Sequence, residues 1–320
     1  MKEPLRRALL IGIDAYRNFT ELSGCVDDAK RMCEVLKRHE DKTPNYDCRL
    51  FTSSRRRPID SVFLKQKWNL LFHDFKGDIL FYYSGHGAQA DTGNQFVTHD
   101  GDGTIPGLAM NDLLTLANLS PAREIVLILD CCFAAGAGDP VLLGGNALLR
   151  EGVTILAGSS SIGFAREIGG HGVFTDLVIS ALNGGAADVQ GHVSAASVYA
   201  YVDQALGAWD QRPIYKSYTS TVSALRHCKP PVPNEVLQNL PKLFKKPDSL
   251  HHLRPSYEYT HKTAKQNQIA IFNQFKILRD ARLLRTVDGQ DLYFAALNSG
   301  AAVLTPLGQF YWRLATSDRI

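Results

Sequence analysis

A histidine and a cysteine in the first half of this 320-residue chain carry the side chains that acyl-transfer chemistry requires. His86 lies in the sequence SGHG (84–87), and Cys132 ends the sequence DCC (130–132). A cysteine thiolate can attack a carbonyl carbon while an imidazole takes the thiol proton and later returns it. We therefore expect His86 to act as general base and Cys132 as nucleophile, provided that the fold brings them together.

Both residues directly follow strongly apolar segments that are typical of buried strands. Residues 79–83 precede the histidine segment, and residues 125–129 precede the cysteine segment. In an open parallel sheet the carboxyl ends of the strands form the crevice where ligands bind. If these two strands are neighbours, the imidazole and the thiol face each other across one groove.

Apolar runs alternate with helix-period segments over the first two-thirds of the chain, which predicts a mostly parallel sheet covered by helices. Further strands are predicted over 8–16, 46–52, 152–158 and 213–218, the last at an edge because of its proline. The predicted helices cover 26–39, 59–75, 112–119, 174–182 and 194–206. We expect an α/β three-layer sandwich over residues 1–227.

The last third of the chain has a different composition. Residues 228–255 contain six prolines and predict a semi-rigid linker. Residues 256–320 predict, in order, a helix over 263–284, a hairpin turn at Asp288-Gly289, strands over 292–297 and 301–304, and a helix capped by Thr305. This order is similar to a winged-helix module, for which we expect a regulatory role with an upstream activator protein docked on it.

Composition limits the partners and the compartment. The formal net charge of +3 is too small to argue for nucleic acid or a membrane, and no run of about 18 apolar residues predicts a membrane span. Asp14 interrupts the first apolar run too early for a secretory signal. The six cysteines show no CxxC spacing and are typical of reduced thiols. We therefore expect a soluble, cytoplasmic protein.

Four segments together resemble the caspase-like cysteine peptidases, most closely the metacaspases and bacterial caspase homologues. YYSGHG (82–87) is followed by ILDCC (128–132), whose last cysteine lies 46 residues after the histidine; caspases separate the pair by about 50 residues. LSGCVDDAKRM (22–32) matches the family's Gly-Cys-x-x-Asp-Ala segment between the first strand and the first helix. QFVTHDGDGTIPG (95–107) resembles the loop after the histidine. The match covers about residues 6–225.

The resemblance implies catalysis by a His–Cys dyad without a third catalytic side chain. The family's Asp-x-Cys pattern selects Cys132 over Cys131, and strand alternation points neighbouring side chains to opposite faces. The resemblance also implies an oxyanion hole from the backbone N–H groups of Gly87 and Cys132; such donors are typically worth about 3 kcal/mol in the transition state. After the nucleophile the chain has Phe-Ala-Ala (133–135) where metacaspases have His-Ser-Gly. These positions do not carry the proton transfers, so the difference affects the geometry of the loop and the shape of the adjoining subsite, not the dyad.

Four residues match the positions that line the first specificity pocket of metacaspases: Cys25, Asp28, Ser84 and Asp130. Two carboxylates suit a guanidinium or an ammonium group, which they bind by charge-assisted hydrogen bonds. We therefore expect protein or peptide substrates cleaved after Arg, with Lys second, whereas cleavage after Asp would require a cationic pocket. Asp28 also occupies a position where a carboxylate stabilises a helix N-terminus, which is compatible with this role.

No cofactor or metal is required by these patterns. Asp100, Asp102, Asp112 and Asp139 are scattered, and residues 100–103 lack the remaining ligands of an EF-hand loop. Adjacent cysteines cannot supply the ligand spacing of tetrahedral zinc. Surface loop acids are the favoured interpretation, so we predict no metal site; some relatives bind calcium for activation, which leaves calcium open.

The glycine-rich stretch 136–150 directly follows the nucleophile and ends in Arg150. Related peptidases are often inactive until a loop in this region rearranges or is cut, so we predict such an activation step, with Arg150 as a processing site, in a signalling or defence cascade. One alternative is a catalytically silent scaffold that recruits partners through its C-terminal module. Another is a DNA-binding regulator. Retention of His86 and Cys132 disfavours the first alternative, and the low net charge disfavours the second.

Overall fold

The computed structural model describes residues 5–90, 93–131, 148–158, 167–168, 171–206, 213–221 and 223–320. The chain forms two compact units, Met1–Ala187 with His192–Cys228 and Asp188–Gly191 with Lys229–Ile320. Cys132, and the predicted activation loop up to residue 147, lie outside the described residues.

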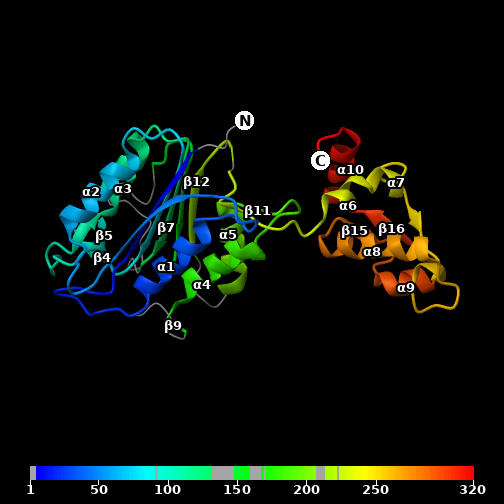
Figure 1. Ribbon diagram of the computed structural model, residues 1–320, viewed down its shortest axis with the longest axis horizontal. Helices are drawn as coiled ribbons and strands as arrows, with labels where there is room; N and C mark the ends of the chain where they lie inside the picture. Colours follow the sequence, from blue (N-terminus) through cyan, green and yellow to red (C-terminus); the bar gives the residue numbers. More distant parts are fainter. Residues whose placement is uncertain are drawn as a thin grey trace. The chain divides into compact units, whose positions relative to one another are not determined.

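The first unit is built on a six-stranded sheet with the order β12-β8-β7-β3-β1-β2 (Figure 1). Its strands are β1 (Arg6–Gly12), β2 (Asp47–Thr52), β3 (Asp78–Ser84), β7 (Glu124–Asp130), β8 (Val153–Ala157) and β12 (Ile214–Tyr218). Neighbours pair in parallel except β12, which pairs antiparallel with β8 at one edge. The predicted mostly parallel sheet is therefore confirmed, including the edge position of its last strand.

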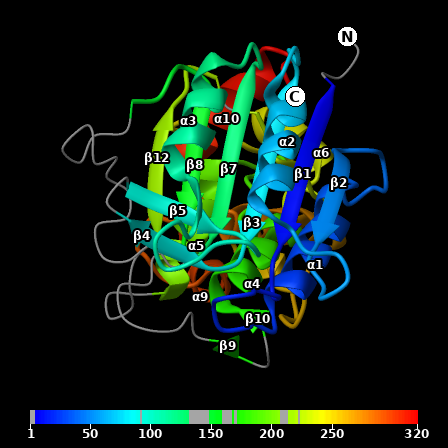
Figure 2. The same cartoon turned by 90° about the vertical axis from the view of Figure 1, so that its left-hand side faces the viewer.

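Helices cover both faces of this sheet (Figure 2). They are α1 (Cys25–Leu36), α2 (Ser61–Phe72), α3 (Met110–Leu119), α4 (Val173–Ser180) and α5 (Ala195–Leu206). Phe81 of β3 packs into a core shared with α2 and α3, whereas its neighbour Tyr82 packs into a core shared with α1, α4 and α5. Because both faces are covered, the central strands are continuous apolar runs, as parallel strands usually are. The three-layer α/β sandwich is confirmed.

Several short elements complete the first unit. An antiparallel sheet with the order β4-β5-β6 directly follows β3; its strands are β4 (Gly87–Ala90), β5 (Gly93–Val97) and β6 (Gly107–Ala109). Two ribbons pair β9 (Glu167–Ile168) with β10 (His171–Gly172) and β11 (His192–Val193) with β13 (Arg226–His227). The π-helical turn η2 (Ala181–Gly185) follows α4.

The second unit places helices around a three-stranded antiparallel sheet with the order β14-β16-β15. Its elements are α6 (Asn234–Gln238), α7 (Leu240–Leu243), β14 (His251–His252), η3 (Pro255–Tyr257), α8 (Gln266–Asp280), β15 (Leu284–Thr286), α9 (Leu292–Leu297), β16 (Ala301–Leu304) and α10 (Pro306–Thr316). One core joins them, including Phe244, Phe272 and Phe275. Thr305 caps α10 as predicted, since its hydroxyl accepts a hydrogen bond from the Gly308 N–H.

The structure differs from two expectations in this unit. The stretch 228–255 contains α6, α7 and β14 and contributes Val236, Leu240 and Phe244 to the core, so it is not a plain linker. The segment 292–297, predicted as a strand, is helix α9. Its side-chain cap is Asp291, which accepts from the Tyr293 N–H. The winged-helix assignment of this module stays a prediction.

Among the helices that the structure describes, none is long and apolar enough to cross a membrane.

Candidate active site

The strand tips that precede His86 and Cys132 lie side by side. β3 and β7 are parallel neighbours, and their register pairs Ser84 with Asp130 at the carboxyl ends. The Gly85 N–H donates to the Asp130 carbonyl at 3.2 Å, which extends this connection one residue beyond β3. His86 and Cys132 therefore each lie two positions past a paired residue. His86 and Gly87 are described; Cys132 is not.

The His86 ring is held through one of its nitrogens. Its Nε2 lies 2.8 Å from the Thr20 carbonyl oxygen. A carbonyl oxygen only accepts hydrogen bonds, so this contact places the proton of the neutral ring on Nε2 and leaves the lone pair on Nδ1. The ring also packs against Tyr16 and Phe19, with centroid distances of 4.8 and 6.4 Å. The free acceptor of the ring is thus Nδ1.

Two tyrosine hydroxyls hold the backbone of His86. The Tyr16 hydroxyl accepts from the His86 N–H at 2.8 Å and donates to the Ile13 carbonyl at 3.0 Å. The Tyr83 hydroxyl lies 2.9 Å from the carbonyl oxygens of both His86 and Val97, which share its one proton. A Cβ at Gly85 would approach both hydroxyls to 2.7 Å, so only glycine fits between them. This arrangement explains why glycine precedes the histidine.

We expect Tyr16→Phe to lower kcat for a peptide substrate by about 10-fold while KM changes little, because the substitution leaves the His86 N–H without its partner at a cost of about 1–3 kcal/mol. The ring contact with His86 is retained, so the effect reports the position of the histidine. The measurement is a steady-state kcat and KM determination.

Tyr257→Phe is the matched control for this experiment. It removes a tyrosine hydroxyl that lies 2.9 Å from His251 Nε2 in the second unit, far along the chain from His86. We expect it to lower the melting temperature without changing kcat. Equal losses of kcat in both variants would show that Tyr16 acts through general stability instead of positioning.

The four residues predicted to line a specificity pocket come together. Cys25 and Asp28 lie in the first turn of α1, Ser84 ends β3, and Asp130 ends β7. Burial raises the pKa of Cys25 well above its ordinary value, and the nearby charges of Asp130 and Asp28 raise it further, whereas a hydrogen bond with Ser84 lowers it. The Cys25 thiol therefore stays protonated at neutral pH.

Asp14 fixes the start of α1 at this place. Its two carboxylate oxygens accept from the Cys25 N–H at 2.9 Å and the Val26 N–H at 3.3 Å. These are N–H groups of the first turn, which have no partner within a helix. The Asp14 side chain, which follows β1, thus caps the N-terminus of α1 and helps to hold Cys25 and Asp28 near the strand tips.

The two carboxylates converge on one glycine. A Cβ at Gly172 would lie 2.8 Å from Asp130 Oδ2 and 3.2 Å from Asp28 Oδ2. Asp28 is buried and accepts from the Gly172 N–H at 3.1 Å. Its other oxygen lies 3.5 Å from the Arg31 guanidinium, which also pairs with Asp176 at 2.5 Å. Arg31 therefore balances part of the charge of Asp28.

Asp130 has a different environment. Its Oδ2 accepts from the Thr175 hydroxyl at 2.5 Å, and the Thr175 oxygen is in turn 2.7 Å from the Tyr82 hydroxyl. Burial raises the pKa of Asp130 to about 6, although the hydrogen bonds from Thr175 lower it. Within the described residues no cation pairs with Asp130. Among the described residues it is therefore the carboxylate of the two that lacks a counter-ion.

The remaining predicted residues have clear places. Cys131 is buried in the core under α2 and α3, on the same face as Leu129. Gly87 opens β4. The Arg150 guanidinium donates to the carbonyls of Ala117, Ala122 and Glu151. Binding of Arg150 in the proposed acidic pocket therefore requires that its guanidinium first leave three carbonyl partners.

The scattered carboxylates serve local structure. Asp100 accepts from the N–H and hydroxyl of Ser61, and Asp102 accepts from the N–H groups of Thr104 and Ile105 in its own turn. Across the described residues no group of three His, Cys, Asp or Glu side chains is arranged to hold a metal. Asp139 lies outside that part of the chain.

Two groups at the site gave no signal in the sequence. The Thr20 carbonyl is a backbone atom, which any residue could supply. Thr175 holds Asp130 through a contact between α4 and β7, and only the fold brings these elements together. Arg31 did give a signal, because it lies three residues after Asp28 in a predicted helix, where residues i and i+3 are neighbours. Tyr16 could have been noticed as a polar residue that ends an apolar strand segment.

Comparisons with known proteins found a matching family model and relatives with similar sequences. A family model described as the caspase domain matches residues 5–225. Metacaspase-3 of Trypanosoma cruzi is 32% identical over 164 residues, covering 46% of this chain and 45% of that protein. Metacaspase-6 of Arabidopsis thaliana is 31% identical over 144 residues, covering 42% of this chain and 39% of that protein. The chain thus spans less than half the length of these relatives.

A solved structure shares the fold. Protein GSU0716 of Geobacter sulfurreducens superposes with a TM-score of 0.52 at 14% identity, covering 71% of this chain and 98% of that one. At this identity the similarity extends to the fold alone.

Proposed function

Because the chain belongs to the caspase-domain family, we propose that it is a cysteine endopeptidase that cleaves after basic residues, arginine before lysine. The observation that carries this proposal is the pairing of Ser84 with Asp130, which sets the histidine and cysteine segments at adjacent strand tips. The two carboxylates around Gly172 supply the charge that a basic side chain requires.

In the proposed reaction the Cys132 thiol gives its proton to His86 Nδ1, and the sulfur attacks the carbonyl carbon of the scissile bond. The Thr20 carbonyl keeps its hydrogen bond to Nε2–H and stabilises the imidazolium that forms. His86 then protonates the leaving amine, and a thioester remains on Cys132. Water gives a proton to His86 and attacks the thioester, which releases the new carboxyl end and restores the thiol.

The negative charge on the substrate oxygen needs hydrogen-bond donors in both tetrahedral intermediates. The N–H groups of Gly87 and Cys132 are the proposed donors, each worth about 3 kcal/mol in the transition state. Gly87 immediately follows the general base, so one loop positions both the proton acceptor and an oxyanion donor.

Specificity follows from charge. A substrate guanidinium can form two parallel hydrogen bonds with a carboxylate, whereas an ammonium acts as a point charge, which favours Arg over Lys. Asp130 is the stronger candidate for this contact, because Arg31 already pairs with Asp28. A substrate aspartate would meet two carboxylates and be repelled.

Regulation is proposed at the segment after the nucleophile and at the second unit. Activation would rearrange or cut the loop that ends at Arg150, and the second unit would receive an activating partner. The contacts of the Arg150 guanidinium favour rearrangement over cleavage at that bond as the first step.

The test is a panel of fluorogenic peptides that end in Arg, Lys, citrulline or Asp, each assayed with and without calcium. We expect turnover of the Arg peptide, slower turnover of the Lys peptide and none of the Asp peptide. An arginine chloromethyl ketone should label the protein once, and peptide mapping should place the label on Cys132. Absence of both turnover and labelling under every condition would favour the silent scaffold.

A further inference from the structure

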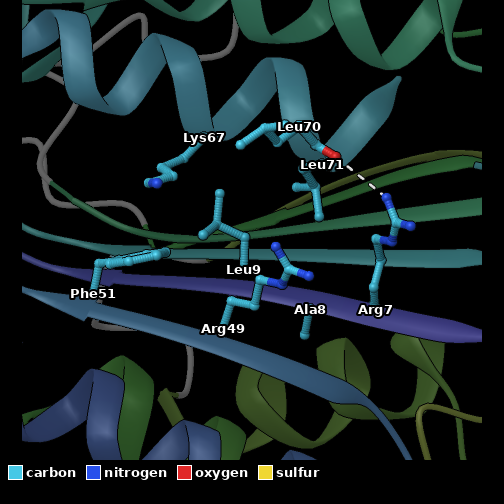
Figure 3. A pocket seen from close by; sticks show the side chains of 8 residues that line it. All are labelled: Arg7, Ala8, Leu9, Arg49, Phe51, Lys67, Leu70 and Leu71. Atoms are coloured by element: carbon cyan, nitrogen blue, oxygen red, sulfur yellow. Dashed lines mark hydrogen bonds between the residues drawn. The ribbon is translucent and has the colours of Figure 1, made fainter. Parts of the chain in front are cut away.

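A groove lined by three cations lies on the first unit (Figure 3). It runs between α2 and the strands β1 and β2 and has a cavity volume of about 40 Å³. Its cations are Arg7, Arg49 and Lys67, and its apolar wall includes Leu9, Phe51, Leu70 and Leu71. Arg7 lies near the amino end of β1, whereas His86 follows the carboxyl end of β3. We call this feature the cationic groove.

The groove forms where α2 passes over the change from an apolar to a charged strand face; α2 contacts β2 through Phe63, whose ring lies 5.2 Å from that of Phe51. Leu9 of β1 pairs in register with Arg49 of β2, so both side chains lie on the sheet face toward α2. This face is therefore apolar at Leu9 and charged at Arg49. α2 directs Trp68 and Leu71 into the core but leaves Leu70 59% exposed at the rim. An exposed leucine beside an exposed arginine is a mixed surface suited to a ligand with both an apolar part and a charge.

The three cations form no ion pair with any of the described residues, although Asp47 of β2 lies opposite Arg7 in the strand register. Lys67 lies over the rings of Phe51 and Phe63, at 4.9 and 4.7 Å from their centroids. Arg7 donates to the Leu70 carbonyl at 3.2 Å. These contacts hold two of the cations beside the groove without neutralising them.

An anion in the groove would relieve an unfavourable interaction. Burial lowers the pKa of Arg7, and the charge of Arg49 lowers it further, although Asp47 raises it. Two cations that lie near each other favour the binding of an acidic ligand beside them.

β2 also offers a backbone surface. It is the last strand of the sheet order, so within the described chain no strand pairs with its outer edge. An extended peptide can add to such an edge through main-chain hydrogen bonds, while its alternate side chains give specificity. Arg49 and Phe51 lie on the face of β2 that turns toward α2, and Leu50 lies on the other.

We propose that the cationic groove binds an extended acidic segment of a partner protein, which lies along β2. Carboxylates of the segment contact Arg49 and Lys67, and an apolar side chain contacts Leu70 and Phe51. A free phosphate would use the cations but gain nothing from the apolar wall, and neither a phosphate nor a nucleic acid would form strand hydrogen bonds with the edge of β2. The groove therefore favours a peptide, and recruits either a substrate or a regulator at a surface separate from the strand tips.

The test uses full-length Cys132→Ala protein, so that bound peptides are not cleaved. A displayed library of random dodecapeptides is sorted on this protein and counter-sorted on the same protein with Arg49→Glu and Lys67→Glu. We expect the enriched peptides to carry two or more Asp or Glu residues around an aliphatic or aromatic residue. The charge reversals should weaken binding of a synthetic enriched peptide by about 10-fold or more, and added salt should weaken it in the unreversed protein.

The control is Lys65→Glu with Lys76→Glu, which changes the net charge equally at exposed positions outside the groove. We expect binding to be retained in this control and lost when the acidic residues of the peptide become amides. The proposal is overturned if no clone distinguishes the two sorting targets, if both double variants lose binding equally, or if an oligonucleotide competes as well as the peptide.

Discussion

Cys132→Ala is expected to lower kcat for an Arg peptide by about 10⁵-fold or more, because it removes the nucleophile on which both acyl-transfer steps depend. The variant should still bind the substrate and should unfold at nearly the same temperature as the wild type. The measurement is a steady-state assay with enough protein to detect residual turnover, together with a thermal melt of each variant.

Cys131→Ala is the matched control, one residue away. Cys131 is 6% exposed and packs in the core with Leu129 under α2 and α3. Removing its sulfur leaves a small cavity that costs about 1 kcal/mol of stability, and activity should stay within about 3-fold of wild type. If Cys131→Ala abolishes turnover while Cys132→Ala does not, the assignment of the nucleophile is wrong.

The strands that carry the site could be predicted because they are buried on both faces. Residues 79–83 and 125–129 are continuous apolar runs, and both proved to be central strands. Their adjacency could not be predicted from local pattern, since the small sheet from β4 to β6 and helix α3 separate them along the chain. The register of β3 with β7 is a long-range property that only the folded sheet fixes.

The errors lie where short apolar runs have two interpretations. Residues 292–297 are few enough to fit either a strand or a short helix, and periodicity cannot separate the two. The Asp291 side chain caps the segment, and Leu292, Ala295 and Ala296 then bury one helical face. The Asp291 cap therefore favours a helix over a strand for residues 292–297, and this cap is a single carboxylate just before the segment.

Prolines misled the interpretation of residues 228–255. Pro233 is the N-cap residue of α6, Pro241 lies in the first turn of α7, and Pro255 begins η3. Proline suits the start of a helix, where its missing N–H is not needed. A cluster of prolines can therefore mark several short helix starts as well as an extended connector.

The candidate specificity residues were predicted from the family resemblance, but the different surroundings of the Asp28 and Asp130 carboxylates were not. Asp28 and Asp130 are equivalent as sequence letters. Among the described residues, Asp28 shares the guanidinium of Arg31 with Asp176, whereas Asp130 accepts from the Thr175 hydroxyl and has no cation beside it. The two carboxylates therefore differ through their neighbours: Arg31 lies three residues after Asp28 in the same helix, and Thr175 contacts Asp130 from helix α4.

Asp130→Asn is expected to lower kcat/KM for an Arg peptide by about 100- to 1,000-fold, because it removes the carboxylate that would bind the guanidinium. Turnover of the matched citrulline peptide, which is neutral and similar in shape, should change by less than about 3-fold. The ratio of the two kcat/KM values isolates the pocket, since the catalytic groups act equally on both peptides. Asp28→Asn should lower the ratio less, because Arg31, which also pairs with Asp176, balances part of the charge of Asp28.

The same ratio should depend on pH in the wild type. Because burial raises the pKa of Asp130 to about 6, the ratio should rise as the pH passes through about 6 and then level off. In Asp130→Asn it should be flat, and in Asp28→Asn the rise should remain. A wild-type ratio that is constant between pH 5 and pH 8 would show that Asp130 does not contact the substrate cation.

Stability should change in the opposite direction to activity. The folded-state pKa of Asp130 is above the unfolded value of about 3.9, so folding takes up a proton between these values and stability falls as the pH rises from about 4 to about 6. The ionised carboxylate is then a cost at neutral pH, which asparagine removes. We expect Asp130→Asn to be more stable than wild type at pH 7, by on the order of 2 kcal/mol, and to lose this advantage at pH 4. Loss of arginine recognition together with a higher melting temperature would identify Asp130 as a residue kept for binding at the expense of stability, and a lower melting temperature at pH 7 would contradict it.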